Sequence, residues 1–320
     1  MDNYYSFFVG DVALDEYYQS PYWPNLKEKI MVEEIQQFCG GMIANAASVY
    51  AGYKESVYFL SLLNSGNTSQ ILCEDLRRGG IDTRYILFDD TLPDSRNMIF
   101  LTENEHTVFT PNLGIEQIEI TPEILEAMCK ARYVYTNIIE IRNLRCGQMK
   151  AIDIIKTIRA SGAKMVYDLD VVQIQSGDEI YFEEMDIAFF NEVGFNVFRN
   201  DLSYEEAVSK LLSYGTQIVV VTFAEKGCKV HTKDQTITVQ GIPVEVVDVT
   251  GAGDTFCSSF TYGLNKTDDL EVVANFANAA GARAVTIMGP RGGVASSQAI
   301  IDFMREKGMD TEKYRNYFID

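Results

Sequence analysis

The residues best placed to do chemistry lie in one short segment, Asp248-Val249-Thr250-Gly251-Ala252-Gly253-Asp254. Two glycines flank an alanine, so the main chain can approach a bound group closely and present several N–H donors to one point. If a helix begins directly after the glycines, its unpaired N–H groups and its positive dipole end favour an anion at that point. A carboxylate at the same helix start, Asp254, could act as a base beside the anion. That combination suits phosphoryl transfer to a hydroxyl group.

The flanking residues indicate the elements that would position this segment. Pro243 to Val249 is rich in β-branched residues and predicts a strand, and Thr255 to Leu264 has small and apolar residues at helical spacing. Phe256 stands where the dinucleotide motif G-x-G-x-x-G needs its third glycine, and no Lys-Ser or Lys-Thr pair follows as in a Walker A loop. The structural alternative is an ordinary tight turn followed by an N-capping aspartate.

Composition excludes several classes of function. The net charge of −19 disfavours a nucleic-acid partner, and the two histidines disfavour a Ser-His-Asp hydrolase or a His-rich zinc site. The six cysteines are scattered without a C-x-x-C pair, which indicates reduced thiols in the cytosol. No apolar stretch is long enough to span a bilayer, and the N-terminus lacks the basic start of a secretory signal. We therefore expect a cytoplasmic protein without a membrane or nucleic-acid partner.

Strand-like and helical segments alternate along the chain, which predicts an α/β fold with a mostly parallel sheet and helices on both faces. The predicted strands are Val57–Leu63, Tyr133–Asn137, Lys164–Asp168, Ile187–Asn191 and Ile218–Phe223, and the predicted helices are Ile71–Gly79, Pro122–Lys130, Gln148–Ser161, Tyr204–Ser213 and Leu270–Val285. Ligands in such sheets bind beyond the carboxyl ends of the strands. Polar residues stand at or just after strand ends at Asp15, Asn137, Asp168, Asn191 and Asp248. Residues 16–39 and 96–109 break the rhythm and predict a small projecting β-structure. No linker divides residues 1–320, which we expect to form a single domain.

The segment 248–254 closely resembles the C-terminal signature of the PfkB (ribokinase-like) carbohydrate kinases, D-T-x-G-A-G-D, from which only Val249 departs. Further segments match family motifs in the expected order: Gly10–Asp15 after the apolar run Phe7–Val9, Gly40-Gly41 with Asn45 to Ala47, Leu76 with Gly80 to Asp82, Thr222 with Lys226-Gly227, and Ala277–Ala280. The resemblance runs from about residue 5 to residue 305. It implies a ribokinase-like fold in which the projecting β-structure is a lid over the sugar and a dimer contact.

The resemblance also implies a role for each matched residue. Asp254 would be the general base, with the N–H groups of Gly251, Ala252 and Gly253 as the anion hole. The positions that resemble the sugar contacts are Asp15, Gly40, Gly41 and Asn45, and those that resemble the ATP contacts are Asn191, Thr222, Gly227 and Asn278. Asp248 and the Thr250 carbonyl, with main-chain groups around 285–289, match a monovalent-cation loop. The implied cofactors are ATP and Mg²⁺, with K⁺ as the ion of that loop.

Departures from the family pattern leave alternatives open. Gly194 stands where the N-x-x-E motif that begins at Asn191 has its glutamate, which affects magnesium handling. Other departures are Ala224 for a glycine, the lack of an arginine in Asp168–Val172, and an unrecognisable segment at Asn64–Ser69. A sugar kinase is the favoured function. The alternatives are a catalytically weak sugar- or nucleotide-binding module and a nucleoside kinase, whose base could stack on Tyr17, Tyr18, Tyr22 or Trp23.

Overall fold

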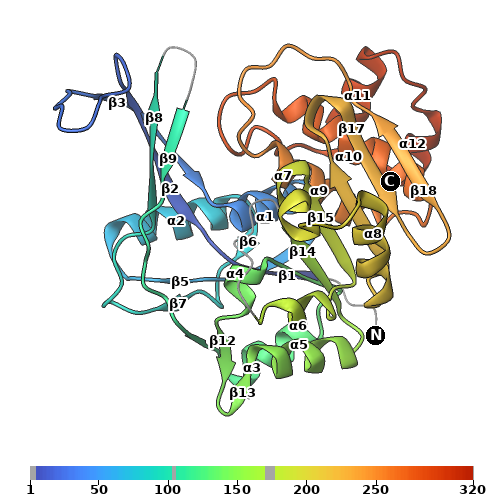
Figure 1. Cartoon of the computed structure of the whole chain (residues 1–320), viewed down its shortest axis with the longest axis horizontal. Coiled ribbons are helices and arrows are strands. Elements are labelled where there is room, and N and C mark those ends of the chain that lie inside the picture. Colours follow the sequence, from blue (N-terminus) through green and yellow to red (C-terminus); the bar gives the residue numbers. More distant parts are fainter. Residues whose placement is uncertain (1–4, 103–105, 170–176, 320) are drawn as a thin grey trace.

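The structure is a computed structural model that describes residues 5–102, 106–169 and 177–319. Its centre is a nine-stranded sheet in the order β18-β17-β16-β15-β14-β11-β1-β4-β6 (Figure 1). Neighbouring strands run parallel from β6 to β16, and β17 and β18 are antiparallel additions at one edge. In chain order the strands are β1 (Tyr5–Val9), β4 (Ser56–Leu60), β6 (Ile81–Asp82), β11 (Tyr133–Thr136), β14 (Lys164–Asp168), β15 (Ile187–Asn191), β16 (Ile218–Thr222), β17 (Gly227–His231) and β18 (Thr236–Gln240).

Helices cover both faces of this sheet, because successive strand residues point to opposite faces and both sets are apolar. In β1, Phe8 belongs to one core cluster, whereas Phe7 and Val9 belong to the other. The first cluster includes residues of α1 (Met42–Gly52), α2 (Asn67–Arg78), α9 (Ala252–Gly263), α10 (Leu270–Ala284), α11 (Ser297–Glu306) and α12 (Glu312–Phe318). The second includes residues of α3 (Pro122–Cys129), α4 (Ile138–Ile141), α5 (Ala151–Ala160), α6 (Glu179–Phe182), α7 (Glu192–Arg199) and α8 (Tyr204–Ser213). The predicted α/β architecture is confirmed. None of the helices described is long and apolar enough to cross a membrane.

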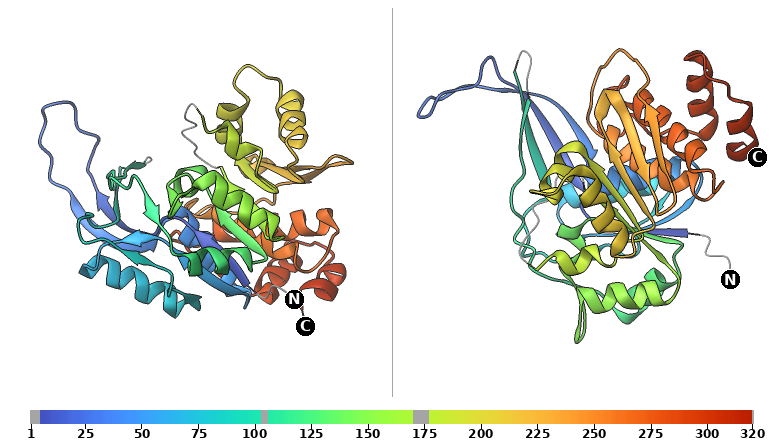
Figure 2. Two further views of the ribbon diagram at one scale, coloured as in Figure 1. Left: turned by 90° about the horizontal axis from the view of Figure 1, so that it is seen from below. Right: turned by 45° about the vertical axis from the view of Figure 1, so that its right-hand side comes forward.

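The two segments that break the βα rhythm form one separate four-stranded sheet. Its order is β3-β2-β8-β9, from strands β2 (Ala13–Gln19), β3 (Glu33–Gly40), β8 (Arg96–Leu101) and β9 (His106–Phe109). This small sheet projects from the body of the molecule (Figures 1 and 2), as predicted. It begins earlier than expected, so Asp15 lies within β2 rather than in a loop after β1.

Several predicted boundaries differ from the observed ones: the helix predicted from Ile71 begins at Asn67, and three others are wrong for local reasons. The run 57–63 is divided into β4 and a short β5 (Leu62–Leu63), which pairs with β7 (Leu87–Phe88) outside the main sheet. The predicted strand 133–137 ends at Thr136, because Asn137 is the N-cap of α4. The helix expected from Gln148 starts at Ala151, because a turn at Gly147 joins β12 (Leu144–Cys146) to β13 (Met149–Lys150); β12 also pairs with β10 (Ile118–Glu119).

The predicted strand Pro243–Val249 is also wrong: this segment belongs to no strand. Its β-branched residues favour extended backbone, but this propensity does not bring the segment to a sheet edge, and the sheet ends at β18. Val246, Val247 and Val249 are accordingly exposed. The N–H groups of Val247 and Asp248 instead donate to the Val285 carbonyl, at 2.8 and 3.1 Å. The segment therefore leads the chain past the end of α10 and into α9.

The turn into α9 requires glycine at residue 251. Gly251 has a φ of 75°, and a Cβ atom there would lie 1.9 Å from the Pro290 carbonyl oxygen. The backbones of the two loops are thus in direct contact, which no side-chain-bearing residue at this position permits.

We expect Gly251→Ala to lower the free energy of unfolding clearly more than Gly80→Ala. Gly80 has a similar φ of 86° but nothing within 4 Å of its added Cβ. Both variants acquire the left-handed strain of about 1–2 kcal/mol, and only the first also pushes two backbones apart. Urea unfolding of both proteins measures the difference, and equal losses would show that the loops are not in contact.

Candidate active site

The predicted base and a predicted sugar-binding residue are in contact. Asp254 lies in the first turn of α9, is 8 % exposed, and accepts a 2.9 Å hydrogen bond through Oδ2 from Nδ2 of Asn45 in α1. The two residues are 209 positions apart in the chain. Helices α1 and α9 pack against each other, and this contact carries the two glycine-rich motifs to one place.

Helix α1 is fixed in place by Asp11, for which the sequence indicated no separate role. The Asp11 carboxylate accepts hydrogen bonds from the N–H groups of Met42 (3.0 Å) and Ile43 (3.2 Å) at the start of the helix. Gly41 precedes them with a φ of 99°, and its Cβ would lie 2.7 Å from the Cα of Val12. The connection between β1 and β2 and the start of α1 therefore touch, which sets the position of the turn that carries Asn45.

Asp15 faces the same region from the small sheet. Its Oδ1 accepts a 2.7 Å hydrogen bond from Asn97 Nδ2 in β8, and a Cβ on Gly40 would lie 2.0 Å from its Oδ2. Burial raises the pKa of Asp15 to about 6; the Asn97 bond lowers it, the Asp11 charge raises it, and Arg291 lowers it again. Glycine at residue 40 is thus the residue that leaves room for this carboxylate.

Acidic groups are concentrated at this end of the sheet. Burial raises the pKa of Asp11 against the two helix N–H groups that lower it. Burial and then the Asp11 charge raise the pKa of Glu140, which follows β11. Tyr135 donates a 2.6 Å hydrogen bond to Asp168 from within β11. The expected polar site at the carboxyl ends of the strands is therefore present, and Glu140 is a member that sequence reasoning missed.

The predicted cation loop brings its two segments together through Asp248. Oδ1 of Asp248 accepts from the Thr250 N–H at 2.9 Å, and Oδ2 accepts from the Gly289 N–H at 2.8 Å. Each carboxylate oxygen thus already holds a backbone donor. In the parts of the chain that the structure describes, no group of three or more His, Cys, Asp or Glu side chains could hold a metal ion.

The backbone donors of the predicted anion hole are not all equivalent. The Ala252 N–H donates to the Val249 carbonyl at 3.3 Å, a long turn bond, while the Gly251 carbonyl accepts from the Thr255 N–H and hydroxyl at 2.9 and 2.7 Å. These bonds hold the turn in shape before the helix begins. The start of α9 consequently has a fixed backbone conformation, and the positive end of the helix dipole favours an anion there.

The four predicted ATP positions lie close together, on β15, β16, β17 and α10. Asn191 pairs with Thr222 across β15 and β16, and Gly227 pairs with Gln240 across β17 and β18. Asn278 in α10 donates a 2.9 Å hydrogen bond to the Gln240 carbonyl. The Asn191 side chain caps α7 by accepting from the Gly194 N–H at 2.7 Å, so Gly194 contributes backbone rather than a carboxylate here.

One residue near the base escaped sequence reasoning altogether. Arg291 Nε donates to Asn45 Oδ1 at 3.4 Å, and its Nη1 forms an ion pair with Asp75 in α2. A connected series therefore runs from Asp75 through Arg291 and Asn45 to Asp254. No local pattern around Arg291 indicates this contact, because its partner Asn45 is 246 positions away.

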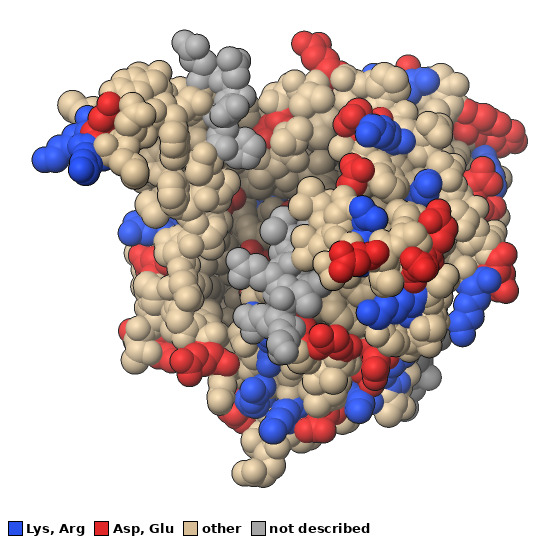
Figure 3. Space-filling model, in the orientation of Figure 1, with Lys and Arg blue, Asp and Glu red and all other residues tan. Residues whose placement is uncertain are grey.

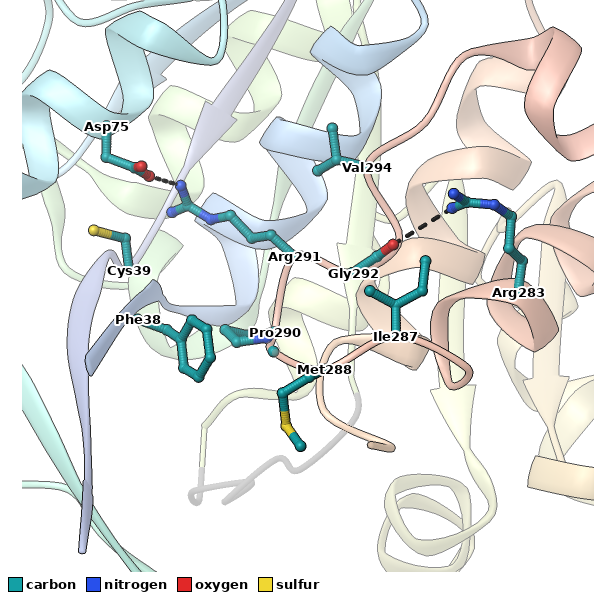
Figure 4. A pocket seen from close by; sticks show the side chains of 11 residues that line it. Phe38, Cys39, Asp75, Arg283, Ile287, Met288, Pro290, Arg291, Gly292 and Val294 are labelled. Carbon is teal, nitrogen blue, oxygen red and sulfur yellow. Dashed lines mark hydrogen bonds and ion pairs between the residues drawn. The ribbon is translucent and has the colours of Figure 1, made fainter. Parts of the chain in front are cut away.

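A cavity of about 440 Å³ opens beside this series (Figure 4). Its lining residues are Phe38, Cys39, Asp75, Arg283, Ile287, Met288, Gly289, Pro290, Arg291, Gly292 and Val294. The surface of the molecule is also hollowed between the small sheet and the body (Figure 3).

We expect Asp15→Asn to stabilise the protein at neutral pH but not at pH 4. Folding raises the pKa of this carboxyl from near 4 to about 6. The carboxyl therefore contributes its full share of the folding stability below pH 4, and this contribution is lost as the pH rises through 6. The amide keeps the Asn97 bond and cannot ionise. The gain should reach at most about 3 kcal/mol by pH 8. Urea unfolding from pH 4 to 8 tests this, and a gain independent of pH would contradict it.

Comparison with known proteins places this geometry in a family. Residues 7–296 match the pfkB family of carbohydrate kinases. The ribokinase of Staphylococcus aureus (strain COL) is 26 % identical over 287 residues, which cover 85 % of this chain and 90 % of that protein. The probable fructokinase-5 of Arabidopsis thaliana is 26 % identical over 275 residues, 78 % of this chain and 83 % of that one.

Solved structures agree on the fold. The Arabidopsis thaliana ribokinase complexed with ribose and ATP has a TM-score of 0.82 at 21 % identity, and covers 94 % of this chain and 98 % of its own. The ribokinase of Thermotoga maritima has a TM-score of 0.80 at 20 % identity, with 94 % and 99 % covered. The chain belongs to the pfkB family of carbohydrate kinases.

Proposed function

We propose that residues 1–320 act as one kinase domain, which transfers the γ-phosphoryl group of ATP to a hydroxyl of a small sugar or sugar-like acceptor. The observation that carries the proposal is the 2.9 Å hydrogen bond between Asn45 and Asp254. It joins the motif that resembles the family's sugar contacts to the one that resembles its catalytic turn. An acceptor that touches Asn45 is then within reach of the carboxylate of Asp254.

In this mechanism Asp254 takes the proton of the acceptor hydroxyl while the hydroxyl oxygen attacks the γ-phosphorus in line and ADP leaves. The N–H groups of Gly251 and Gly253 would face the transferred group at the start of α9, joined by that of Ala252 once it releases its long 3.3 Å bond to the Val249 carbonyl. They stabilise the negative charge on its oxygens, the part of such reactions where positioned donors contribute most. The base contributes about 10²–10⁴-fold.

The acceptor would be bound between the small sheet and α1. Asp15 and Asn45 offer a carboxylate and an amide, which can accept from and donate to neighbouring hydroxyl groups. Gly40 and Gly41 bring the main chain close to the same space, and Asp15 already fills part of it. The small sheet, which carries Asp15 on β2 and Gly40 on β3, would act as the lid.

ATP would lie along Asn191, Thr222, Gly227 and Asn278, with its phosphates at the start of α9. Magnesium binds mainly through substrate phosphates, water and one or two carboxylates, so it would arrive with ATP and neutralise the phosphate charge. The chain offers Asn191 there, and Gly194 supplies no carboxylate. For K⁺, the ligands would come from Asp248, the Thr250 carbonyl and the loop 285–289; the Asp248 carboxylate brings these segments together through the N–H groups of Thr250 and Gly289.

The nucleoside alternative loses part of its support. Tyr17 is buried and packs edge-on against Phe38, and Tyr18 stacks on Phe100 within the small sheet. Trp23 stacks on Phe109. These rings have partners inside the lid, which favours a structural role. The binding-module alternative remains the outcome if no acceptor is turned over.

We expect Asp254→Asn to lower kcat by about 10²–10⁴-fold without a loss of thermal stability, because the base is removed and the amide can still accept from Asn45. The assay is ADP release with Mg²⁺ and K⁺ across free sugars, sugar acids, sugar phosphates and nucleosides. Asp269→Asn is the matched control: Asp269 also stands at a helix start, as the N-cap of α10, where asparagine caps equally well. Equal activity of Asp254→Asn and wild type would refute the assigned base.

We also propose that the exposed apolar face of the small sheet is covered by a second copy of this chain, as the family resemblance implies. Leu26 and Met31, in the connection between β2 and β3, are 96 % and 92 % exposed. Leu26→Asp with Met31→Asp should convert a dimer to a monomer in sedimentation, whereas Val197→Asp on the exposed side of α7 should not. A monomeric wild type would end this proposal.

A further inference from the structure

The cavity beside the active site differs in charge from the rest of the molecule. The chain as a whole has a net charge of −19, yet the ionisable side chains at the cavity, apart from the Cys39 thiol, are two arginines and one aspartate. Arg291 and Asp75 line one end, and Arg283 of α10 lies at the other (Figure 4). A local excess of positive charge in an acidic protein favours an anionic ligand.

The aspartate does not cancel this excess. Asp75 Oδ2 pairs with Arg291, while its Oδ1 accepts from Arg78 at 2.8 Å, so one carboxylate is shared by two guanidinium groups. Arg283 forms a 3.4 Å hydrogen bond with the Gly292 carbonyl, and it has no ion pair among the residues that the structure describes. The two arginines and one aspartate therefore leave the cavity lining with a net positive charge, and the carboxylate that pairs with Arg291 is shared with Arg78.

Arg291 also retains an unused donor. Its side chain is 17 % exposed, and Nη2 is buried with no hydrogen-bond partner in the described part of the chain. An unpaired buried donor costs about 1–3 kcal/mol, and more when it is charged. A ligand oxygen at Nη2 would remove that cost. Guanidinium groups bind the paired oxygens of carboxylates and phosphates best.

The same guanidinium lies at the edge of the proposed acceptor site. Asn45 accepts from Arg291 through Oδ1 and donates to Asp254 through Nδ2, so its amide separates the base from the guanidinium. Arg291 also lowers the pKa of Asp15 against the effect of burial. One small molecule that lies along Asn45 can thus meet Asp254 with one end and Arg291 with the other.

We propose that Arg291 determines acceptor specificity, and that the acceptor carries an anionic group, a carboxylate or a phosphate, which Arg291 binds at the cavity. This inference rests on the proposed kinase function, because it places the anionic group at the end of the acceptor remote from the hydroxyl that reacts. Arg283 adds charge at the far end of the cavity. The acidic residues Asp15 and Asp254 face the neutral hydroxyl end.

The test uses matched acceptors that differ in the anionic group: glucose with gluconate, ribose with ribose 5-phosphate, and fructose with fructose 6-phosphate. Binding is measured by calorimetry with wild type and Arg291→Gln, at low and at high salt. In at least one pair the acidic member should bind wild type 10-fold or more tightly than the neutral one. Arg291→Gln should remove that advantage, because it should weaken binding of the acidic member at least 10-fold more than binding of the neutral one. High salt should reduce the difference in affinity between the acidic and the neutral member in wild type. The carboxylate and phosphate arms identify which anion is bound.

Arg78→Gln is the matched control. It removes the same charge from the same partner, Asp75, but Arg78 is 80 % exposed and does not line the cavity. It should change the acidic affinity less than 3-fold. Each variant leaves Asp75 one arginine, so both should fold, which their melting temperatures check. Equal losses of affinity in the two variants would show that the overall electrostatic field attracts the anion, rather than direct contact with Arg291. That result would overturn the proposal.

ADP release measured on the same samples separates the two claims. If a neutral sugar is phosphorylated while no acidic member binds more tightly, the kinase proposal stands and the role of Arg291 is refuted. If an acidic ligand binds through Arg291 and no acceptor is turned over, the anion site stands and the kinase proposal fails. A neutral preference that is unchanged in Arg291→Gln also refutes the role of Arg291.

Discussion

The active site depends on how closely α1 and α9 approach each other, because that approach lets Asn45 reach Asp254. Small residues make it possible: Ala46 and Ala47 on α1 and Ser258 and Ser259 on α9 are all buried. The Ser258 hydroxyl donates to the Ala46 carbonyl at 2.6 Å, so only one serine side chain separates the two helix backbones at this point. Larger side chains at these positions would move the two glycine-rich turns apart, and with them the proposed acceptor site and the proposed base.

The second constraint is electrostatic. The region around the base holds Asp11, Asp15 and Glu140, whose pKa values are raised by burial. Such a cluster is unfavourable for ATP, which must be bound by backbone donors, ions and a few basic groups. The fixed turn at Gly251 and the start of α9 meet this need without side-chain charge. Arg291 is a basic group that contacts Asn45, and its pairing with Asp75 holds it at the edge of the proposed acceptor site.

Much of this arrangement could be predicted from the sequence, because the signals were local. Buried apolar runs predicted the strands, and glycine pairs predicted the turns that carry Asp254 and Asn45. Apart from element boundaries, the failures were long-range. Pro243–Val249 has the composition of a strand, but whether it pairs depends on a sheet edge that the segment cannot specify. The sequence neighbours of Arg291 give no indication of its contact with Asn45, which forms only when the fold brings residue 45 beside it.

The central claim is that Asn45 and Asp254 form one functional unit, and a double-mutant cycle on kcat/KM tests it most directly. With Asn45→Ala, Asp254→Asn and the double variant, we expect strong non-additivity. The double variant should be no more than a few-fold worse than Asp254→Asn alone, because the residues act through their mutual contact. If the two losses instead multiply, the residues act independently, and the hydrogen bond between them does not organise the site.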